Sequence, residues 1–145
     1  MGIFHRKSTA QASQLDALRA EYDNYRRRTA QELETAGTAA ARKTALPFLS
    51  LYDDLSRALA ANCADEAYYK GIELIYKNLL ATMAGLKIVP MDSKGKIFNP
   101  TYHEAVGQIT DPRYRTDEIA EVVQVGFLMD EEVIRHAKVI VANCL

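Results

Sequence analysis

The residues that break helices are distributed very unevenly along this chain, and this distribution constrains the fold most. Between Ile3 and Leu46 there is a single glycine and no proline, whereas all four prolines lie at or after Pro47. Glycine and proline destabilise the interior of a helix more than any other residues. The first third of the chain is therefore free to form one long helix, and the last third is punctuated like a small sheet domain.

The predicted first helix runs from about Gln11 to about Ala45. At about 1.5 Å per residue it would be about 50 Å long, which is too long for a helix buried in a lone domain of this size. Its apolar positions are spaced 3, 4 and 3 apart, as in a short coiled-coil seam, and they are Leu15, Leu18, Tyr22 and Tyr25. We expect a parallel or antiparallel helix pair made by self-association. The alternative is a monomeric amphipathic helix folded back on its own domain.

Two shorter helices are predicted to follow. Apolar residues recur at helical spacing from Phe48 to Leu59 and again from Tyr69 to Met83, with a break at 62–67 and Gly85 placed to cap the second helix. Such a pair forms a hairpin, and two hairpins in a dimer would form a four-helix bundle. The dimer-interface residues expected on this hairpin are Leu51, Leu55, Ile72, Ile75 and Leu79.

After residue 87 the pattern changes to short strands. Strand-forming residues occur at 88–89, at 119–129 with a bend at Gly126, at 133–134 and at 139–141, separated by turn sequences at 92–96 and 99–100. The predicted fold class is α+β, with a long N-terminal dimerisation helix, a helical hairpin and a small C-terminal β-domain. The predicted division is a disordered stretch at 1–10, a helical dimerisation part at 11–86 and a β-rich wing at 87–145.

The composition excludes several classes of protein. The 145 residues carry 18 basic and 19 acidic side chains, so near-neutral charge gives no electrostatic case for nucleic acid as the main partner. The longest apolar runs are a few residues, far from the roughly 18–20 needed to cross a bilayer. The two cysteines, Cys63 and Cys144, are too few for a disulfide framework or a closed zinc site. We expect a cytoplasmic protein without a membrane partner.

No catalytic constellation stands out. His103, Glu104 and His136 are the candidates for acid–base or metal chemistry, but His-x-x-x-His, a cysteine pair and glycine-rich phosphate loops are absent from the sequence. His103 is better explained as a structural histidine hydrogen-bonded near the turn at 99–100. We expect no enzyme, no cofactor, no metal and no direct nucleotide binding. A small metal-dependent hydrolase using these three residues is the disfavoured alternative.

The arginine cluster at 26–28 leaves two interpretations open. Successive helical residues differ by about 100°, so at least one arginine faces away from the seam. The cluster is either a solvated face paired with Glu21, Asp23 and Glu32, or a patch that binds a partner.

Several motifs, in order along the chain, together resemble one family. The most specific is FNPTYHEAV at 98–106, and RAEYDNYRRRT at 19–29 matches a long-helix signature. Further matching segments lie at 46–59, 70–75, 122–127 and 133–139. Over roughly residues 15–142 the sequence resembles GrpE, the nucleotide exchange factor of DnaK-type chaperones. Glu131 and Glu132 depart from the pattern, because a basic residue is common there.

The resemblance implies a homodimer that presents one β-domain to the ATPase domain of a DnaK-type chaperone, favours the open nucleotide cleft and so accelerates ADP release. The partner-binding positions that it implies are Asn24, Arg26, Arg27, Arg57, Gly71, Val123, Gln124, Gly126 and Val141. For Val123 and Val141 burial in the sheet core is an open alternative, because alternation alone does not show which face is outward. The alternative function is a structural helical homodimer whose β-domain binds another protein.

Overall fold

The computed structural model describes the backbone of residues 2–144 and the side chains of residues 10–144. The chain forms two compact units, Met1–Ala41 and Arg42–Leu145, which are described separately. Helix α1 spans Gly2–Ala45, so the long helix and its predicted end are confirmed. The disorder predicted for residues 1–10 stays a prediction, and the side chains of residues 1–9 lie outside the described part.

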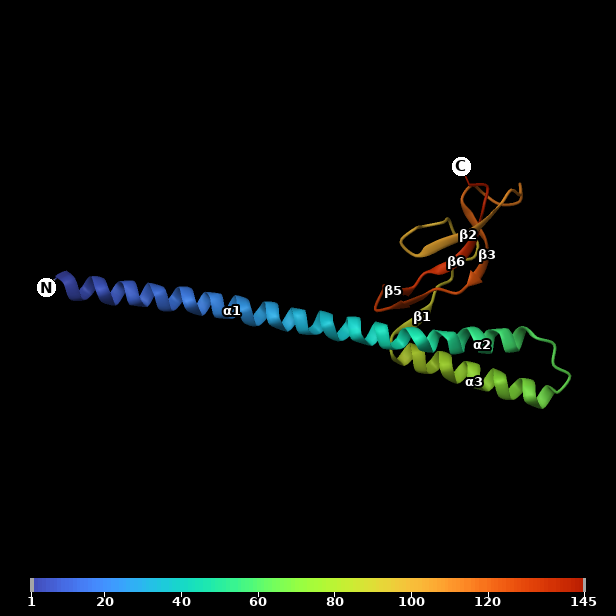
Figure 1. Cartoon of the computed structure of the whole chain (residues 1–145), viewed down its shortest axis with the longest axis horizontal. Helices are drawn as coiled ribbons and strands as arrows, with labels where there is room; N and C mark the ends of the chain where they lie inside the picture. Colours follow the sequence, from blue (N-terminus) through green and yellow to red (C-terminus); the bar gives the residue numbers. More distant parts are fainter. Residues whose placement is uncertain (1, 145) are drawn as a thin grey trace. The chain divides into compact units, whose positions relative to one another are not determined.

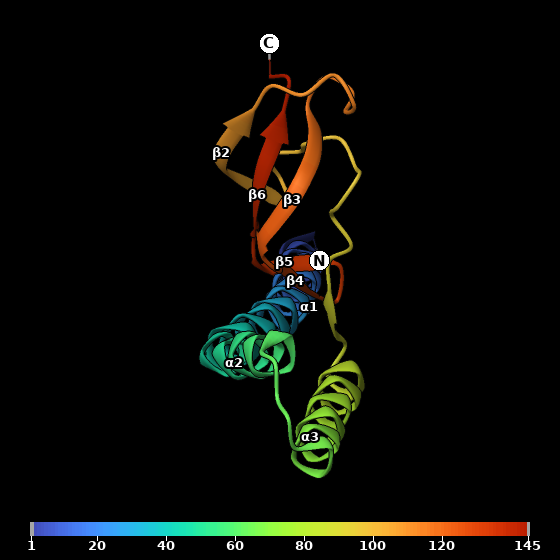
Figure 2. The ribbon, with the colours of Figure 1, turned by 90° about the vertical axis from the view of Figure 1, so that its right-hand side faces the viewer.

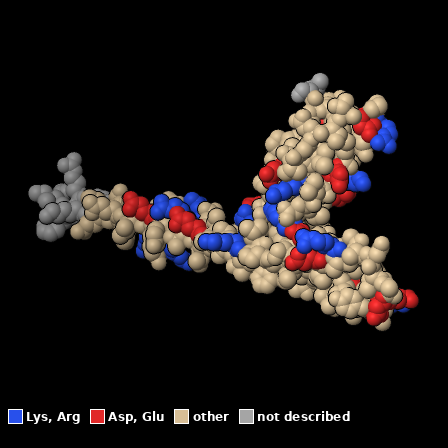
Figure 3. Space-filling view, turned by 45° about the vertical axis from the view of Figure 1, so that its right-hand side comes forward, with Lys and Arg blue, Asp and Glu red and all other residues tan. Residues whose placement is uncertain are grey.

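Within the first unit, α1 leaves its apolar side chains largely uncovered. Leu15, Leu18, Tyr22 and Tyr25 are between 50% and 61% exposed. The charged side chains of α1 are of both signs and are mixed along the helix, as Figure 3 shows. Arg28 pairs with Glu32 one turn later, at 3.4 Å. The seam predicted from the spacing therefore has no cover from the described residues of its own unit.

The helical hairpin opens the second unit. A short 3-10 turn, Leu46–Phe48, contains Pro47 and leads into α2, Leu49–Ala60. Helix α3, Glu66–Gly85, begins where the Asp65 carboxylate accepts hydrogen bonds from the backbone N–H groups of Ala67 and Tyr68, at 3.0 and 3.1 Å. That cap satisfies two donors that the first helical turn leaves free. Helices α2 and α3 lie side by side and run in opposite directions (Figure 1).

The end of α3 differs from the prediction. Gly85 is the last helical residue and does not adopt the left-handed capping conformation. The backbone turns at Lys87 instead, with φ 60°, after the Leu86 N–H has bonded to the carbonyl groups of Thr82 and Met83. Lys87 then forms an ion pair with Asp130 at 3.1 Å. The turn thus leads directly into the first strand.

The strands form two three-stranded sheets. The first has the order β1-β4-β5 and is antiparallel, with β1 Ile88–Pro90, β4 Phe127–Met129 and β5 Glu132–Arg135. The second has the order β2-β6-β3, with β2 His103–Ile109, β3 Glu118–Gln124 and β6 Ala137–Ala142. Figure 2 shows β6 between its two neighbours. The α+β class is confirmed.

Strand β2 is the element that the sequence pattern did not predict. It pairs with β6 in parallel, and the register shifts between Ala105 and Gly107. Its residues His103–Ile109 mix one histidine, one glycine and only three apolar side chains, without regular alternation. The pairing with β6, which is distant in sequence, makes this segment a strand, and local propensity does not.

Two apolar cores lie in this second unit. The first joins the helices to the first sheet and contains Leu49, Tyr52, Met83, Ile88 and Phe127. The ring of Phe127 meets that of Tyr52 edge-on, with centroids 4.9 Å apart. The second core lies under the other sheet. The chain changes from helix to strand between α3 and β1, but the first core includes residues from both sides of this change, Met83 before it and Ile88 after it. The division at 86/87 into a dimerisation part and a wing stays a prediction.

The two glycines that were predicted as partner contacts have opposite environments. A Cβ on Gly126 would lie 2.5 Å from the backbone N of Ala137 and 2.9 Å from the carbonyl O of Arg135. A Cβ on Gly71 would have no atom of the chain within 4 Å. The first position is fixed by packing within the chain, and the second is not.

We expect Gly126→Ala to lower the free energy of unfolding by about 1–3 kcal/mol, because backbone atoms must move to admit the methyl group. The matched change Gly71→Ala should raise it by about 1 kcal/mol, because alanine is the better helix former. Urea denaturation followed by circular dichroism measures both. Equal effects of the two substitutions would contradict the packing described above.

Candidate partner-binding site

An open groove of about 500 Å³ lies between α2 and the end of β3. The chain segments that line it are brought together by the first core, since Tyr52 of α2 packs on Phe127 just after β3. The structure thereby places three predicted contact residues, Arg57, Val123 and Gln124, around one groove. The complete lining is Tyr52, Asp53, Ser56, Arg57, Val123, Gln124, Val125 and Lys138.

A polar network joins the two walls of the groove. Arg135 of β5 donates two parallel hydrogen bonds to the Asp53 carboxylate, from Nη1 to Oδ2 at 2.7 Å and from Nη2 to Oδ1 at 2.8 Å. Gln124 Nε2 donates to Asp53 Oδ2 at 3.0 Å. The same guanidinium donates to the Val125 carbonyl from Nε at 3.1 Å and from Nη2 at 2.7 Å. Helix α2, the end of β3 and strand β5 are therefore tied at one carboxylate.

The network also sets the charge state of that carboxylate. Burial acts to raise the pKa of Asp53, but the hydrogen bonds from Arg135 and Gln124 outweigh it, so the pKa lies below its ordinary value. The Arg135 guanidinium also lies 5.3 Å above the ring of Phe127. Asp53 is thus ionised at neutral pH and is occupied by partners of its own chain.

The groove residues differ in how far they are free to meet a partner. Val123 is 56% exposed, and Arg57 reaches solvent, with a surface ion pair to Asp54 at 3.3 Å. Val141 is 1% exposed within the second core, and Gly126 is buried. The sheet-core alternative thus describes Val141, because β6 directs it inward together with Val139, whereas Val123 points outward.

The candidates on α1 lie in the other compact unit. Arg27 donates to the side-chain oxygen of Asn24 at 3.1 Å, one turn earlier. Arg26 lies over the ring of Tyr22, 6.0 Å from its centroid. These contacts are exposed and local, and both guanidinium groups keep donors free for another molecule.

The residues predicted at a dimer interface are exposed to different degrees. On the hairpin, Leu51 and Ile75 are about half exposed, while Leu55, Ile72 and Leu79 are half-buried, and Leu79 packs on the chain's own first core. Gly71 lies on the exposed side of α3. The interface assignment stays a prediction.

Comparison with known proteins decides the family. A sequence model of the GrpE family, described as GrpE, matches residues 4–143. The chain is 39% identical over 126 residues to Protein GrpE of Clostridium acetobutylicum and 40% identical over 126 residues to that of Clostridium beijerinckii, each match covering 87% of this chain. It is 34% identical over 131 residues to Protein GrpE of Chlorobaculum tepidum, covering 86% of this chain.

The chain belongs to the GrpE family. The match covers 62% of the Clostridium acetobutylicum protein, 68% of the Chlorobaculum tepidum protein and 60% of the Clostridium beijerinckii protein. The chain therefore spans about three fifths to two thirds of the length of these GrpE relatives. The resemblance stated from the motifs is confirmed.

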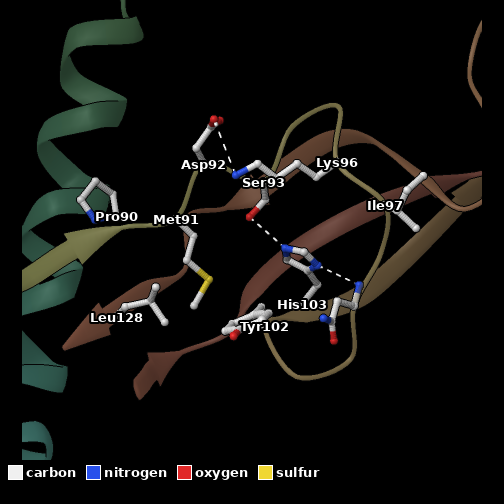
Figure 4. Close-up of a pocket in the computed structure, with 10 residues that line it drawn as sticks. Pro90, Met91, Asp92, Ser93, Lys96, Ile97, Tyr102, His103 and Leu128 are labelled. Atoms are coloured by element: carbon white, nitrogen blue, oxygen red, sulfur yellow. Dashed lines mark hydrogen bonds and ion pairs between the residues drawn. The ribbon is translucent and has the colours of Figure 1, made fainter. Parts of the chain in front are cut away.

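The segment 98–106, which carried the GrpE resemblance most specifically, contributes Asn99, Tyr102 and His103 to the lining of a second pocket (Figure 4). The backbone N–H of Asn99 donates to His103 Nδ1 at 3.0 Å, so the proton of the neutral ring lies on Nε2. Nε2 lies 3.1 Å from the Oγ of Ser93 and donates to it. In this tautomer the imidazole cannot remove a proton from the serine hydroxyl. His103 is the structural histidine of the turn.

Among the residues that the structure describes, no group of three or more histidine, cysteine, aspartate or glutamate side chains could hold a metal ion. The described helices also include none that is long and apolar enough to cross a membrane.

Several residues that shape the groove were not singled out from the sequence. In the sequence analysis, Asp53 and Arg135 lie within the matching segments 46–59 and 133–139, and no role was predicted for either. Ser56 and Lys138 line the groove as well. Asp53 and Arg135 are far apart in the chain, and no local spacing indicates their pairing. A covarying pair of positions among relatives is the sequence signal that could have indicated it.

His103 makes folding stability depend on pH. Burial, and the positive charges of Lys96 and His136, lower the pKa of His103 below its ordinary 6.5. The unfolded chain therefore binds a proton more readily, so stability is complete above about pH 6.5 and falls as the pH drops towards the folded-state pKa. We therefore expect the protein to unfold at a lower urea concentration at pH 5.5 than at pH 7.5.

The variant His103→Asn separates this effect from other titrating groups. At pH 7.5 it should cost about 1–3 kcal/mol, because Ser93 loses its buried partner. Its urea midpoint should then change less between the two pH values than that of the wild type. An equal pH dependence in both proteins would show that His103 is not the responsible group.

Proposed function

We propose that this chain is a nucleotide exchange factor for a DnaK-type chaperone. It binds the ATPase domain better when the nucleotide cleft is open than when it is closed. Linkage then requires that nucleotide affinity fall by the same factor, so ADP leaves faster. The observation that carries the proposal is membership of the GrpE family over residues 4–143, with motif residues gathered at one groove.

The groove supplies suitable chemistry for a protein partner. Val123 offers exposed apolar surface on β3, and Arg57 offers an exposed cation on α2. Because Asp53 is already paired with Arg135, the groove does not add an unpaired carboxylate. A partner surface with an apolar side chain beside a carboxylate would therefore complement it.

We infer a homodimer as the working form. The half-exposed seam follows heptad spacing and has no cover from the described residues of its own unit; its residues are Leu15, Leu18, Tyr22 and Tyr25. Each such side chain stabilises an interface by about 1.5–3 kcal/mol when fully buried. Gly71 is a separate argument, for a contact with the chaperone and not for the dimer. A mid-helix glycine costs about 1 kcal/mol relative to alanine, and a Cβ at Gly71 would have no described atom of its own chain within 4 Å. Close contact with another molecule at this point of α3 would explain why a glycine stands there.

The proposed activity makes and breaks no covalent bond. It needs no catalytic residue, cofactor, metal or nucleotide bound to this chain, and His103 serves the fold. We place the protein in the cytoplasm together with its chaperone partner. The competing function, a structural dimer whose β-domain binds another protein, is the outcome that remains if exchange is not observed.

Nucleotide release tests the proposal directly. A DnaK-type chaperone from the same organism is loaded with fluorescent ADP and mixed with a stoichiometric amount of this chain in the presence of excess unlabelled ADP. Stopped-flow fluorescence should show ADP release accelerated at least about tenfold. A tenfold acceleration corresponds to a decrease of about 1.4 kcal/mol in the activation free energy of release. Unchanged release at stoichiometric and tenfold higher amounts would reject the proposal.

Two substitutions test the contact residues away from the groove. Arg27→Ala should weaken binding to the ATPase domain at least about tenfold, because a charged hydrogen bond contributes about 1.5 kcal/mol or more. Gly71→Asp should weaken it at least about tenfold, by adding bulk and charge where close approach is needed. Calorimetry measures affinity, and sedimentation checks that both variants keep the oligomeric state of the wild type.

Each substitution has a matched control. Arg28→Ala removes a neighbouring arginine that pairs with Glu32, and Gly71→Ala adds only a methyl group. We expect the affinity of Arg28→Ala to stay within about twofold of the wild type, since its side chain forms a surface pair within the helix. Wild-type affinity in both Arg27→Ala and Gly71→Asp would remove these residues from the interface.

A further inference from the structure

Strand β5 carries two ion pairs to the helices, in addition to the apolar contacts of the first core. Glu132 at its start pairs with Arg42, near the end of α1, and Arg135 at its end pairs with Asp53 of α2. In the sheet formed by β2, β6 and β3, Gln124 at the end of β3 donates a hydrogen bond to the same Asp53 carboxylate. Figure 3 shows acidic and basic atoms side by side where the helix pair meets the β-domain.

The two ion pairs on β5 differ in exposure and in whether they fix the orientation of the strand against the helices. Glu132 is 62% exposed, so its pair with Arg42 is screened by solvent. The side chains of Arg135 and Asp53 are only 16% and 21% exposed. Two parallel hydrogen bonds between planar groups fix both the distance and the relative orientation of the elements that carry them. Only the second pair has this geometry.

A buried ion pair often contributes little net stability, because desolvation offsets the attraction. Its effect here is geometric. Asp53 lies on α2 one turn before Arg57, and Gln124, which binds the same carboxylate, follows Val123 on β3. Moving the carboxylate would therefore move the two walls of the groove relative to each other.

We propose that Asp53 and Arg135 are positioning residues, which hold Arg57 and Val123 at the separation that the partner surface requires. The proposal rests on the proposed exchange function and adds to it. Neither residue touches the partner. They act by fixing the orientation of β5 and the end of β3 against α2, so the groove is formed before binding and no ordering is needed on encounter.

A distance measurement within one chain tests the geometry. Spin labels are placed on the native Cys63, at the turn between α2 and α3, and on Glu104→Cys of β2, with Cys144→Ser. Labelled chain is mixed with an excess of chain carrying Cys63→Ser and Cys144→Ser, so that each labelled chain reports on itself in any oligomer. Pulsed electron paramagnetic resonance then gives the distribution of distances between the label on the hairpin and the label on the sheet.

In this labelled background, Asp53→Asn should broaden the distance distribution at least twofold, because Arg135 loses its carboxylate partner. The control is Glu66→Gln, the same chemical change in an ion pair of the same 2.7 Å length whose carboxylate side chain is 80% exposed. This control should keep the narrow distribution of the parent. An unchanged distribution in a folded Asp53→Asn variant would overturn the geometric claim.

Binding to the ATPase domain of a DnaK-type chaperone supplies the second readout. Asp53→Asn should lose at least tenfold in affinity, and Glu66→Gln should lose less than twofold. The double variant Asp53→Leu with Arg135→Met removes both charges and should recover most of the melting temperature lost in Asp53→Asn, since no charge is left unpaired. It should still show the broad distance distribution and the low affinity, because apolar contact does not fix orientation.

Recovery of affinity together with melting temperature in the double variant would mean that the pair serves stability alone, and the proposal would fail. If the wild-type chain does not bind the ATPase domain at all, the exchange function fails. The distance distributions then still decide whether Asp53 and Arg135 fix the groove. The two failures are therefore distinguishable.

Discussion

The contact between α2 and the first sheet holds the second compact unit of this chain together. Tyr52 and Phe127 meet edge-on inside the first core, and the Asp53 carboxylate beside them receives the forked hydrogen bonds of Arg135. Apolar burial at Tyr52 stabilises the contact but does not fix the orientation of α2 against the sheet, whereas the hydrogen bonds of the ion pair do. The burial of Tyr52 also raises the pKa of its hydroxyl, next to that of Tyr76, to about 12.

This arrangement supports a β-domain whose strands are only three to seven residues long. Small sheets bury little apolar area and gain stability by packing against other elements. Sharing the first core with α2 and α3 gives this sheet a fixed support. The function proposed for this chain is to favour one of two states of a partner. A rigid surface suits this function, because less binding energy is lost in ordering the surface than with a flexible one.

The sequence predicts the helical part well, because local signals dominate there. The absence of breakers before Pro47 indicates the long helix, and apolar spacing indicates the hairpin. Strand β2 and the groove could not be found in this way, since each depends on contacts between distant segments. The cap after α3 was also missed, because Lys87 rather than glycine adopts the left-handed conformation. Val141 shows the same limit, since alternation gives two faces without saying which is buried.

The central claim is that the helical hairpin and the β-domain form one cooperative unit fastened at Asp53 and Arg135. Native-state hydrogen exchange of the free protein tests it most directly, because it gives an opening free energy for each segment. The account predicts that the amides of α2, α3, β4 and β6 exchange with the same opening free energy and the same denaturant dependence. Opening of β4 and β6 at a clearly lower free energy, while α2 and α3 stay protected, would contradict it.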